Sequence, residues 1–504
     1  MNFKSIRYVL SRIMLAEAAM MMISLGVTLI YGETDKIVSF VIPICLLAVF
    51  GLLIGIKSEK NGEIYARDGF AIVAFSWILM SLFGALPLML SGMIPNYIDA
   101  VFETVSGFTT SGTTIMTEIE GFLAKGFYGV LFWRSFTHWI GGMGVLVFVM
   151  AVLPMSGNRN MHIMRAEVPG PEVGKLVSKI SKTAKILYGI YLAMTLIETA
   201  MLFAGGMPLY EAFIHSFGTA GTGGFSIWND SIGHYAAAGD PHALYFEMVI
   251  TAFMLLFGVN FNLFYFMLLR QFKASLKNEE LRLYFGIVTF ATVAIAINIL
   301  NTVSNFGEAL RRSVFQVASL ITTTGYGTVD LNAWPSFAKT VVILLMFLGA
   351  MAGSTGGGFK LYRILILCKS AKNEMRRLIH PNSVIPLRID DKTVDEKTVR
   401  GTYVYFVVYS IVLIVSTLLI GIDPASTDFT TAFSSTLSCL NNIGPIIGGQ
   451  SVFAPFSYAS KLLFTLNMLL GRLEIFPILM IFFPSMWSRR KSKIKKIKKA
   501  AVSE

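Results

Sequence analysis

The chain has 504 residues, of which 54% are hydrophobic and only 14% are charged, and its formal net charge is +12. A mean hydropathy of +0.65 excludes an ordinary soluble domain, in which about 25% of residues are charged. Three isolated cysteines without metal-ligand spacing support neither a disulfide framework nor a zinc site. We therefore expect an all-α polytopic membrane protein.

Apolar runs in chain order predict ten membrane spans, because about 20 apolar residues cross a bilayer. The first run is too long for a signal-peptide core and is expected to stay as a helix. The eighth is short, and we expect a glycine-rich segment to continue it as a broken helix. The runs are residues 9–31, 37–56, 69–91, 126–153, 186–205, 244–269, 283–303, 337–348, 402–420 and 462–483.

Basic residues cluster beside alternate apolar runs, which predicts an orientation. By the positive-inside rule these clusters face the cytoplasm, so we expect both termini there. The charge lies beside spans and therefore favours anionic membrane lipid as a partner, with no nucleic acid. The basic tail is expected to act as an interfacial anchor. The clusters lie within residues 4–12, 57–67, 159–185, 270–282, 369–400 and 489–499.

Four short polar segments interrupt the apolar sequence. They are TTSGTT, TAGTGGFS, TTTGYGT and NNIGPIIG at residues 109–114, 219–226, 322–328 and 441–448. Their anchor glycines, Gly112, Gly223, Gly325 and Gly444, lie 111, 102 and 119 residues apart. Four similar loops from one chain can close a ring of carbonyl oxygens, which replaces the hydration shell of a cation at membrane depth. An ion pathway is therefore the leading interpretation.

Each polar segment has the same predicted surroundings. An apolar span precedes it, then an amphipathic half-helix too short to cross a bilayer, and another span follows. Such a half-helix points the negative end of its dipole at the centre. Non-helical backbone at this depth must be buried in protein or line water. The predicted half-helices are residues 98–106, 210–217, 308–319 and 428–438.

We expect four span–pore-loop–span repeats around a pseudo-four-fold central pore, preceded by a two-helix hairpin outside the repeats. The predicted domains are the N-terminal transmembrane hairpin at 1–66, repeat 1 at 67–158, repeat 2 at 159–269, repeat 3 with an intramembrane gate loop at 270–369, repeat 4 at 370–488 and the basic cytoplasmic tail at 489–504.

Backbone carbonyls of three residues in each segment are the candidate ligands of the cation. Glycine suits such loops because it visits positive φ without steric strain. The alternative is helix packing by small residues, but the segments lack small-xxx-small spacing and include Pro445. The candidate filter residues are Thr110, Ser111, Gly112, Gly221, Thr222, Gly223, Thr323, Thr324, Gly325, Asn442, Ile443 and Gly444.

This ordered set of segments resembles the Trk/Ktr/HKT superfamily of potassium transporters, and the extra hairpin resembles its TrkH-type pore-forming subunits. Supporting motifs are RSFTHWIGGMG at 134–144, AGSTGGGFK at 352–360, CLNNIGP at 439–445 and GRLEIF at 471–476, and the resemblance spans residues 3–490. In that superfamily, glycine at the first-loop anchor goes with potassium preference and serine with sodium permeation in some plant members. Gly112 therefore favours potassium.

The glycine-rich segment at 349–358 is expected to break the eighth span. Five glycines in ten residues suit a hinge or gate, with passive packing as the alternative. The resemblance implies an intramembrane loop that obstructs the pathway beneath the filter, and an arginine that adds positive charge there. A structural ion pair is the alternative role for that arginine. The candidate gate residues are Gly349, Gly353, Gly356, Gly357, Gly358, Lys360 and Arg472.

The resemblance implies potassium uptake across the bacterial plasma (inner) membrane, with K+ as the transported ion and no organic cofactor on this chain. It also implies a homodimer and a cytosolic nucleotide-binding regulatory ring of TrkA-like Rossmann subunits. An alternating-access cation symporter coupled to H+ or Na+ is the alternative. A membrane enzyme is not expected, because the spans contain no HExxH motif, nucleophile–base pair or paired carboxylates.

Overall fold

The structure is a computed structural model that describes residues 1–56, 58, 65–144, 180–383 and 385–487. Some sequence predictions therefore lie outside the described residues, wholly or in part. They include the end of the fourth apolar run, the basic clusters within 57–67 and 159–185, and the basic tail at 489–504.

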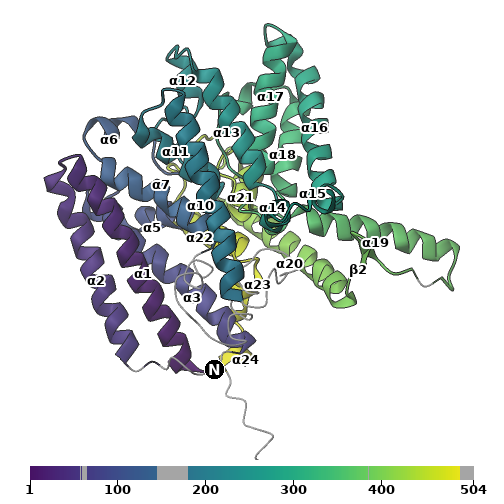
Figure 1. Ribbon diagram of the computed structural model, residues 1–504, viewed down its shortest axis with the longest axis horizontal. Coiled ribbons are helices and arrows are strands. Elements are labelled where there is room, and N and C mark those ends of the chain that lie inside the picture. The colour runs from purple at the N-terminus through teal and green to yellow at the C-terminus, as the bar shows by residue number, and fades with distance from the viewer. Residues whose placement is uncertain (57, 59–64, 145–179, 384, 488–504) are drawn as a thin grey trace, which may run out of the picture.

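The N-terminal hairpin consists of two helices that lie side by side at one edge of the molecule (Figure 1). These are α1 (Phe3–Ile30) and α2 (Ile37–Ile56), joined by a turn that includes η1 (Thr34–Lys36). The Ser11 hydroxyl donates to the Gly51 carbonyl at 2.6 Å and joins the two helices. The Glu33 carboxylate accepts from the backbone N–H of Gly129 at 3.2 Å, which fixes the hairpin turn to the first repeat.

The same order of helices follows four times. Each unit has a long first helix, a short second helix, an extended loop and a third helix that is also shorter than the first. The first helices are α3 (Ala66–Gly84) continued by α4 (Leu86–Leu90), α10 (Ile180–Ala204), α16 (Glu279–Ile299) and α20 (Glu396–Ile420). The short helices are α5 (Tyr97–Phe108), α11 (Leu209–Gly221), α17 (Phe306–Ile321) and α21 (Phe429–Asn441). The third helices are α7 (Tyr128–Gly142), α13 (Ala243–Phe257), α18 (Ser336–Leu348) and α22 (Tyr458–Arg472).

The short helices confirm the four predicted half-helices. They contain 12, 13, 16 and 13 residues, which is less than the roughly 20 that a bilayer requires. Side chains of the residue before the helix cap three of them: Asn96, Asn305 and Asp428 accept from backbone N–H groups of the first turn. Each helix ends directly before a polar loop, as the sequence predicts.

The third helices differ from the sequence prediction of continuous spans. They contain only 13 to 15 residues, or about 20 Å at 1.5 Å per residue. Helix α13 is followed at a 94° bend by α14 (Phe261–Leu268). Helix α22 is followed after a short break by α23 (Phe476–Ile481). The predicted break after α18 is confirmed, and residues 349–360 connect it to α19 (Leu361–Ile379). We call this segment the gate loop after the role that the sequence predicts for it.

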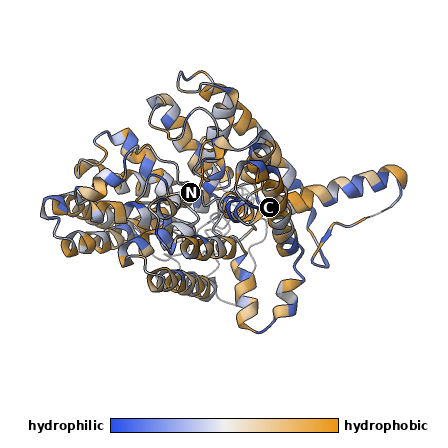
Figure 2. Ribbon diagram, turned by 90° about the horizontal axis from the view of Figure 1, so that it is seen from above, coloured by the Kyte–Doolittle hydropathy of each residue, from blue (hydrophilic) through white to orange (hydrophobic). Residues whose placement is uncertain are grey.

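Among the described residues, six helices are long and apolar enough to cross a bilayer, and the bent α13–α14 pair makes a seventh. The remaining predicted spans are shorter or broken helices. Helix α19 projects from the body, carries both hydrophobic and hydrophilic residues, and leads to a small hairpin (Figures 1 and 2). The other elements are α6 (Glu120–Ala124), α12 (Gly233–Ala237), α15 (Phe272–Leu276), η2 (Leu300–Thr302), η3 (Leu331–Ala333), β1 (Arg388–Ile389), β2 (Lys392–Thr393) and α24 (Pro484–Trp487).

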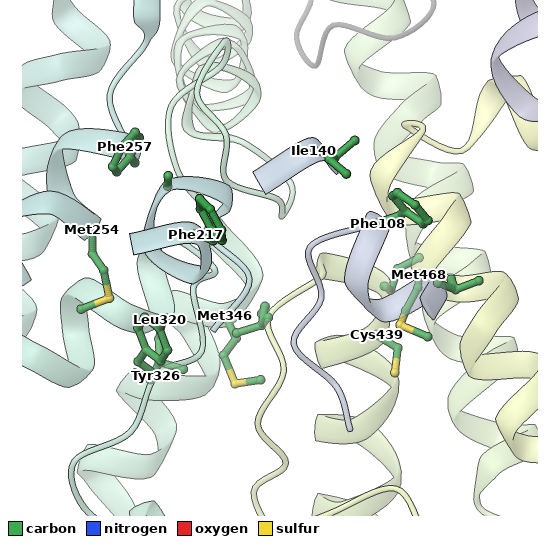
Figure 3. Packing of buried hydrophobic residues seen from close by; sticks show 14 of the residues in the cluster. Phe108, Ile140, Phe217, Met254, Phe257, Leu320, Tyr326, Met346, Cys439 and Met468 are labelled. Atoms are coloured by element: carbon green, nitrogen blue, oxygen red, sulfur yellow. The ribbon is translucent and has the colours of Figure 1, made fainter. Parts of the chain in front are cut away.

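The core lies around the four short helices. Each contributes large side chains that are almost fully buried, including Phe108 from α5, Phe217 from α11, Leu320 from α17 and Cys439 from α21 (Figure 3). Because these helices are surrounded by the longer ones, apolar packing holds their C-terminal ends in place. The four polar loops therefore start from rigid positions.

Candidate functional site

The four loops after the short helices share one unusual backbone conformation. We call them loop 1 (109–119), loop 2 (222–232), loop 3 (322–330) and loop 4 (442–457). Thr110, Thr222, Thr323 and Asn442 have φ values of 56°, 54°, 60° and 55°. Left-handed φ is a strained conformation for a β-branched residue such as threonine, and such strain concentrates at functional sites. The repetition at four matching positions indicates that the loops have one common shape.

A glycine with positive φ lies two residues after each left-handed residue. The φ values are 72°, 74°, 84° and 110° at Gly112, Gly224, Gly325 and Gly444. In loop 2 this glycine is Gly224, whereas the sequence analysis took Gly223 as the anchor. The register of loop 2 therefore differs by one residue from the prediction, and Gly221 is the last residue of α11. The adjacent pair of glycines hides this register in the sequence.

Each of these glycines lies against a carbonyl group of the next loop. A Cβ placed on Gly112, Gly224 or Gly325 would lie only 2.0, 2.1 or 2.0 Å from the carbonyl oxygen of the next loop. The oxygens belong, in that order, to Gly223, Thr324 and Ile443. A Cβ on Gly444 would lie 3.0 Å from the carbonyl oxygen of Ser111, which returns to loop 1.

These contacts run from loop 1 to 2, 2 to 3, 3 to 4 and 4 to 1, so the four loops close a ring. Of the predicted filter residues, these contacts involve Ser111, Gly112, Gly223, Thr324, Gly325, Ile443 and Gly444, with Gly224 in place of the predicted Gly221. Any side chain at the ring glycines would collide with a neighbouring backbone, which explains why glycine occupies these positions. A ring of converging carbonyl groups is an arrangement that can coordinate a dehydrated cation.

The gate loop lies directly against the start of loop 3 and the end of α21, just before loop 4. The backbone N–H of Gly357 donates to the Thr323 hydroxyl at 2.6 Å, and that of Gly358 donates to the Asn441 carbonyl at 3.0 Å. The buried Lys360 ammonium group donates to the Gly356 carbonyl within the same loop. The gate loop is therefore held by hydrogen bonds to backbone and side-chain groups beside the ring.

The break between α13 and α14 also contacts the gate loop. The Phe261 N–H donates to the Gly353 carbonyl at 3.0 Å, and the Met351 N–H donates to the Gly258 carbonyl at 3.2 Å. Helix ends leave backbone groups without intrahelical partners, and here those groups bind the gate loop. The sequence prediction of an unbroken sixth span was wrong, because the long apolar runs on both sides outweighed the break signal of Gly258 and of Asn260, which caps α14.

Arg472 joins the gate loop to the end of the first repeat. It is buried and donates to the carbonyls of Thr355 and Gly142, at 2.9 and 2.7 Å, and to that of Gly141. These contacts place its charge beside the gate loop. Arg472 is the last residue of α22, not an interior residue of a continuous helix as the tenth apolar run predicts.

Glu474 lies in the break after α22 with a φ of 55° and forms an ion pair with Arg363 of α19. Because α22 ends at Arg472, Glu474 does not continue that helix. The pair links the helix that follows the gate loop to the end of the fourth repeat.

Sequence reasoning did not identify the buried pair of Glu103 and Arg134. Arg134 Nε donates to the Glu103 carboxylate at 2.8 Å, and the side chains are 2% and 0% exposed. A charged residue inside an apolar helix is itself a functional signal. Glu103 in α5 and Arg134 in α7 are both residues of this kind. Their pairing is a tertiary contact between residues 31 positions apart. Nearby, the His138 ring stacks on Phe225, with 4.0 Å between ring centroids.

Comparison with known proteins gives consistent results. Residues 36–491 match a family described as TrkH, cation transport protein. The chain is 34% identical over 498 residues to the Trk system potassium uptake protein TrkH of Escherichia coli strain K12, covering 97% of this chain and 100% of that protein. It is 30% identical over 466 residues to the Trk system potassium uptake protein TrkG of the same strain, covering 92% and 94%. The crystal structure of the potassium transporter TrkH from Vibrio parahaemolyticus matches with a TM-score of 0.85 and 28% identity, covering 97% and 100% of the two chains.

Proposed function

We infer that this chain, which belongs to the TrkH family of cation transport proteins, is a multi-pass membrane protein that takes up potassium through a ring of backbone carbonyls. The relatives that cover nearly its whole length are potassium uptake proteins. The observation that carries the proposal is the closed ring formed by the four loops. It supplies converging carbonyl oxygens at the centre of a membrane-spanning bundle.

The proposed filter contains the left-handed residue, the middle residue and the glycine of each loop. The middle residues are Ser111, Gly223, Thr324 and Ile443, and the carbonyl of each lies against the glycine of the preceding loop in the ring. Loops 1, 3 and 4 keep the predicted residues, and loop 2 uses Thr222, Gly223 and Gly224. Dehydrating a cation is costly, and carbonyl oxygens from all four loops together can replace its hydration shell. Short helices that end at the ring add the negative ends of their dipoles.

We further propose that the gate loop closes the pathway below the ring. Its contacts with Thr323, Asn441 and Arg472 hold it in place. These bonds have to break before the loop moves, and the glycines Gly349, Gly353 and Gly358, with φ of 72°, 74° and 79°, supply backbone freedom for that movement. Gly356 and Lys360 belong to the same loop and move with it.

The bacterial inner membrane, cytoplasmic termini, a homodimer and a cytosolic nucleotide-binding ring stay predictions from the resemblance. The basic clusters next to the spans support the orientation. Helix α19 begins at the end of the gate loop and projects from the body (Figure 1). A partner that bound α19 would therefore be connected to the gate through a single helix.

The test of the proposal is rescue of a bacterium that lacks its own potassium uptake systems. Expression of this chain should restore growth in low-potassium medium and accumulation of K+, and disruption of the ring by Gly325→Val should abolish both with the protein still present in the membrane. Failure of the wild-type chain to raise cellular K+ would contradict the proposal. Transport rates per molecule then separate the two modes, because a pore passes ions far faster than an alternating-access symporter.

A further inference from the structure

One equivalent position on each short helix carries a buried polar side chain. In the first three repeats this side chain lies near its own loop, whereas in the fourth its hydroxyl donates to the Ala432 carbonyl of the same helix. Seven residues before the left-handed residue of each loop are Glu103, His215, Gln316 and Ser435. All four are at most 1% exposed. Buried polar groups are costly unless they bind a partner inside the protein. The contacts of these residues therefore report how each loop is held behind the ring.

Glu103 makes the most extensive of these contacts. One carboxylate oxygen accepts from the Thr114 hydroxyl and from Arg134 Nε, both at 2.8 Å. The other oxygen accepts from the backbone N–H of Ile115 at 3.0 Å. Hydrogen bonds to an ionised group are roughly twice as strong as neutral ones. Glu103 therefore pins loop 1 two and three residues after Gly112.

The other repeats use neutral groups for the same purpose. His215 Nε2 lies 3.2 Å from the Ser226 hydroxyl of loop 2. Gln316 Nε2 lies 3.5 Å from the Thr328 hydroxyl of loop 3, which is a weak contact at best. In the fourth repeat the contact shifts by one residue, and the Ser434 hydroxyl donates to a backbone carbonyl of loop 4 at 2.6 Å. Among these four positions the strongest anchoring is at loop 1.

Arg134 extends the anchor of loop 1 to loop 2. Its Nη2 donates to the Thr114 hydroxyl of loop 1 and its Nη1 donates to the Ser226 carbonyl of loop 2, both at 3.2 Å. The guanidinium carbon also lies 3.4 Å from the ring centroid of Phe225, directly after Gly224. One rigid, planar group thus fixes the spacing between two neighbouring loops.

We propose that Glu103 and Arg134 are positioning residues that set the ion selectivity of the ring. They hold loop 1 against loop 2, so the carbonyls of Ser111 and Gly223 keep the spacing that suits one size of cation. The proposal rests on the proposed function, since it assigns these residues a part in discrimination between ions. Neither side chain needs to touch the ion, because both act through the loops.

The test compares the K+/Na+ permeability ratio of variants in liposomes. Glu103→Gln keeps the size of the side chain but leaves the Arg134 charge unpaired in a buried site, which is strongly unfavourable. We expect the ratio to fall by about tenfold, which corresponds to about 1.4 kcal/mol in relative free energy. Thr114→Val removes the hydroxyl that both charged groups share and leaves no unpaired charge, and it should also lower the ratio.

Asp99→Asn is the matched control. Asp99 lies one turn before Glu103 on the same helix and accepts from Lys461 Nζ at the same distance of 2.8 Å, but its partner is on α22 and not on a loop. This variant should keep the wild-type ratio. A wild-type ratio in folded Glu103→Gln protein, or an equal loss in Asp99→Asn, would overturn the proposal.

If Glu103→Gln does not yield folded protein, Thr114→Val decides, and an unchanged ratio in that variant overturns the proposal. The wild-type measurement separates the two levels of the account. A wild-type chain without preference for K+ contradicts the proposed function itself. A selective wild-type chain with unchanged variants contradicts only the assignment of Glu103 and Arg134.

Discussion

Replacement of Gly112 by serine is the sharpest single perturbation of the ring. A Cβ at this position would lie 2.0 Å from the Gly223 carbonyl oxygen, and real Cβ atoms essentially never approach within 3.0 Å of another heavy atom. The carbonyl must therefore move by about 1 Å or the loops must separate. The φ of 72° at this residue adds strain for any side chain, of about 1–2 kcal/mol.

The expected effect on ion binding follows from Coulomb's law. A carbonyl oxygen carries about half a unit charge, and a move from about 3 to about 4 Å from a monovalent cation at an effective dielectric constant of about 20 weakens their attraction by about 0.7 kcal/mol. That is about a threefold loss of affinity for each displaced carbonyl. On the account that the wild-type spacing of the ring suits K+ and not the smaller Na+, this loss falls on K+, and we expect the K+/Na+ permeability ratio of Gly112→Ser to fall about threefold.

The assay is the reversal potential of the purified variant in liposomes with K+ on one side and Na+ on the other. Gly126→Ser is the matched control, because Gly126 has a φ of 74° but no heavy atom within 4 Å of its Cβ position. It carries the same backbone strain without a collision and should keep the wild-type ratio. An unchanged ratio in folded Gly112→Ser protein would refute the assignment of the Gly112–Gly223 contact to the filter.

Three further predictions concern the gate and the fold. Deletion of residues 353–358 should raise basal cation flux in liposomes, and lower flux from folded protein would assign the loop a structural role. Arg472→Gln removes hydrogen-bond donors to the carbonyl of Thr355 in the gate loop and to α7. Each hydrogen bond to a charged group is worth about 1.5–3 kcal/mol, so the gate loop should be held less tightly and cation flux should rise severalfold. Wild-type flux from this variant would contradict a role of Arg472 in holding the gate loop. Burial alone would raise the pKa of Asp423, but hydrogen bonds from Ser457 and Ser460 hold this pKa below its ordinary value. The ionised Asp423 carboxylate therefore stabilises the folded state above about pH 4. This contribution is lost as the pH falls through the lower pKa that the group has in the folded state. Asp423→Asn should lower thermal stability at pH 7 and not in strong acid, and an equal loss at both would contradict this.

The short helices and the polar loops were predictable because their chemistry is local. An amphipathic segment that ends at a run of Thr, Ser, Gly or Asn carries its own signal for a re-entrant helix and a turn. The break after α18 was predictable for the same reason, since Gly349 and the glycines that follow are a strong local signal. Apolar composition likewise predicted the N-terminal hairpin.

Other features depend on contacts that no local pattern contains. Gly223 and Gly224 both tolerate positive φ, so only the contact of Gly224 with the Thr324 carbonyl fixes the register of loop 2. Gly258 and Asn260 mark a break after Phe257, but the 94° bend itself is not indicated by the apolar residues on both sides of it. Pro477 marks a helix break near Glu474, but the left-handed conformation of Glu474 and its ion pair with Arg363 are not indicated by the local sequence.

The central claim is that four backbone loops form one potassium-selective ring. The most direct test is the reversal potential of the purified wild-type chain, alone in liposomes, under opposed gradients of K+ and Na+. The account predicts a potential close to the K+ equilibrium value, which moves toward zero when Gly112, Gly224 or Gly325 is replaced by alanine. A potential near zero from a conducting wild-type chain, or glycine variants that keep the K+ value, would contradict the account.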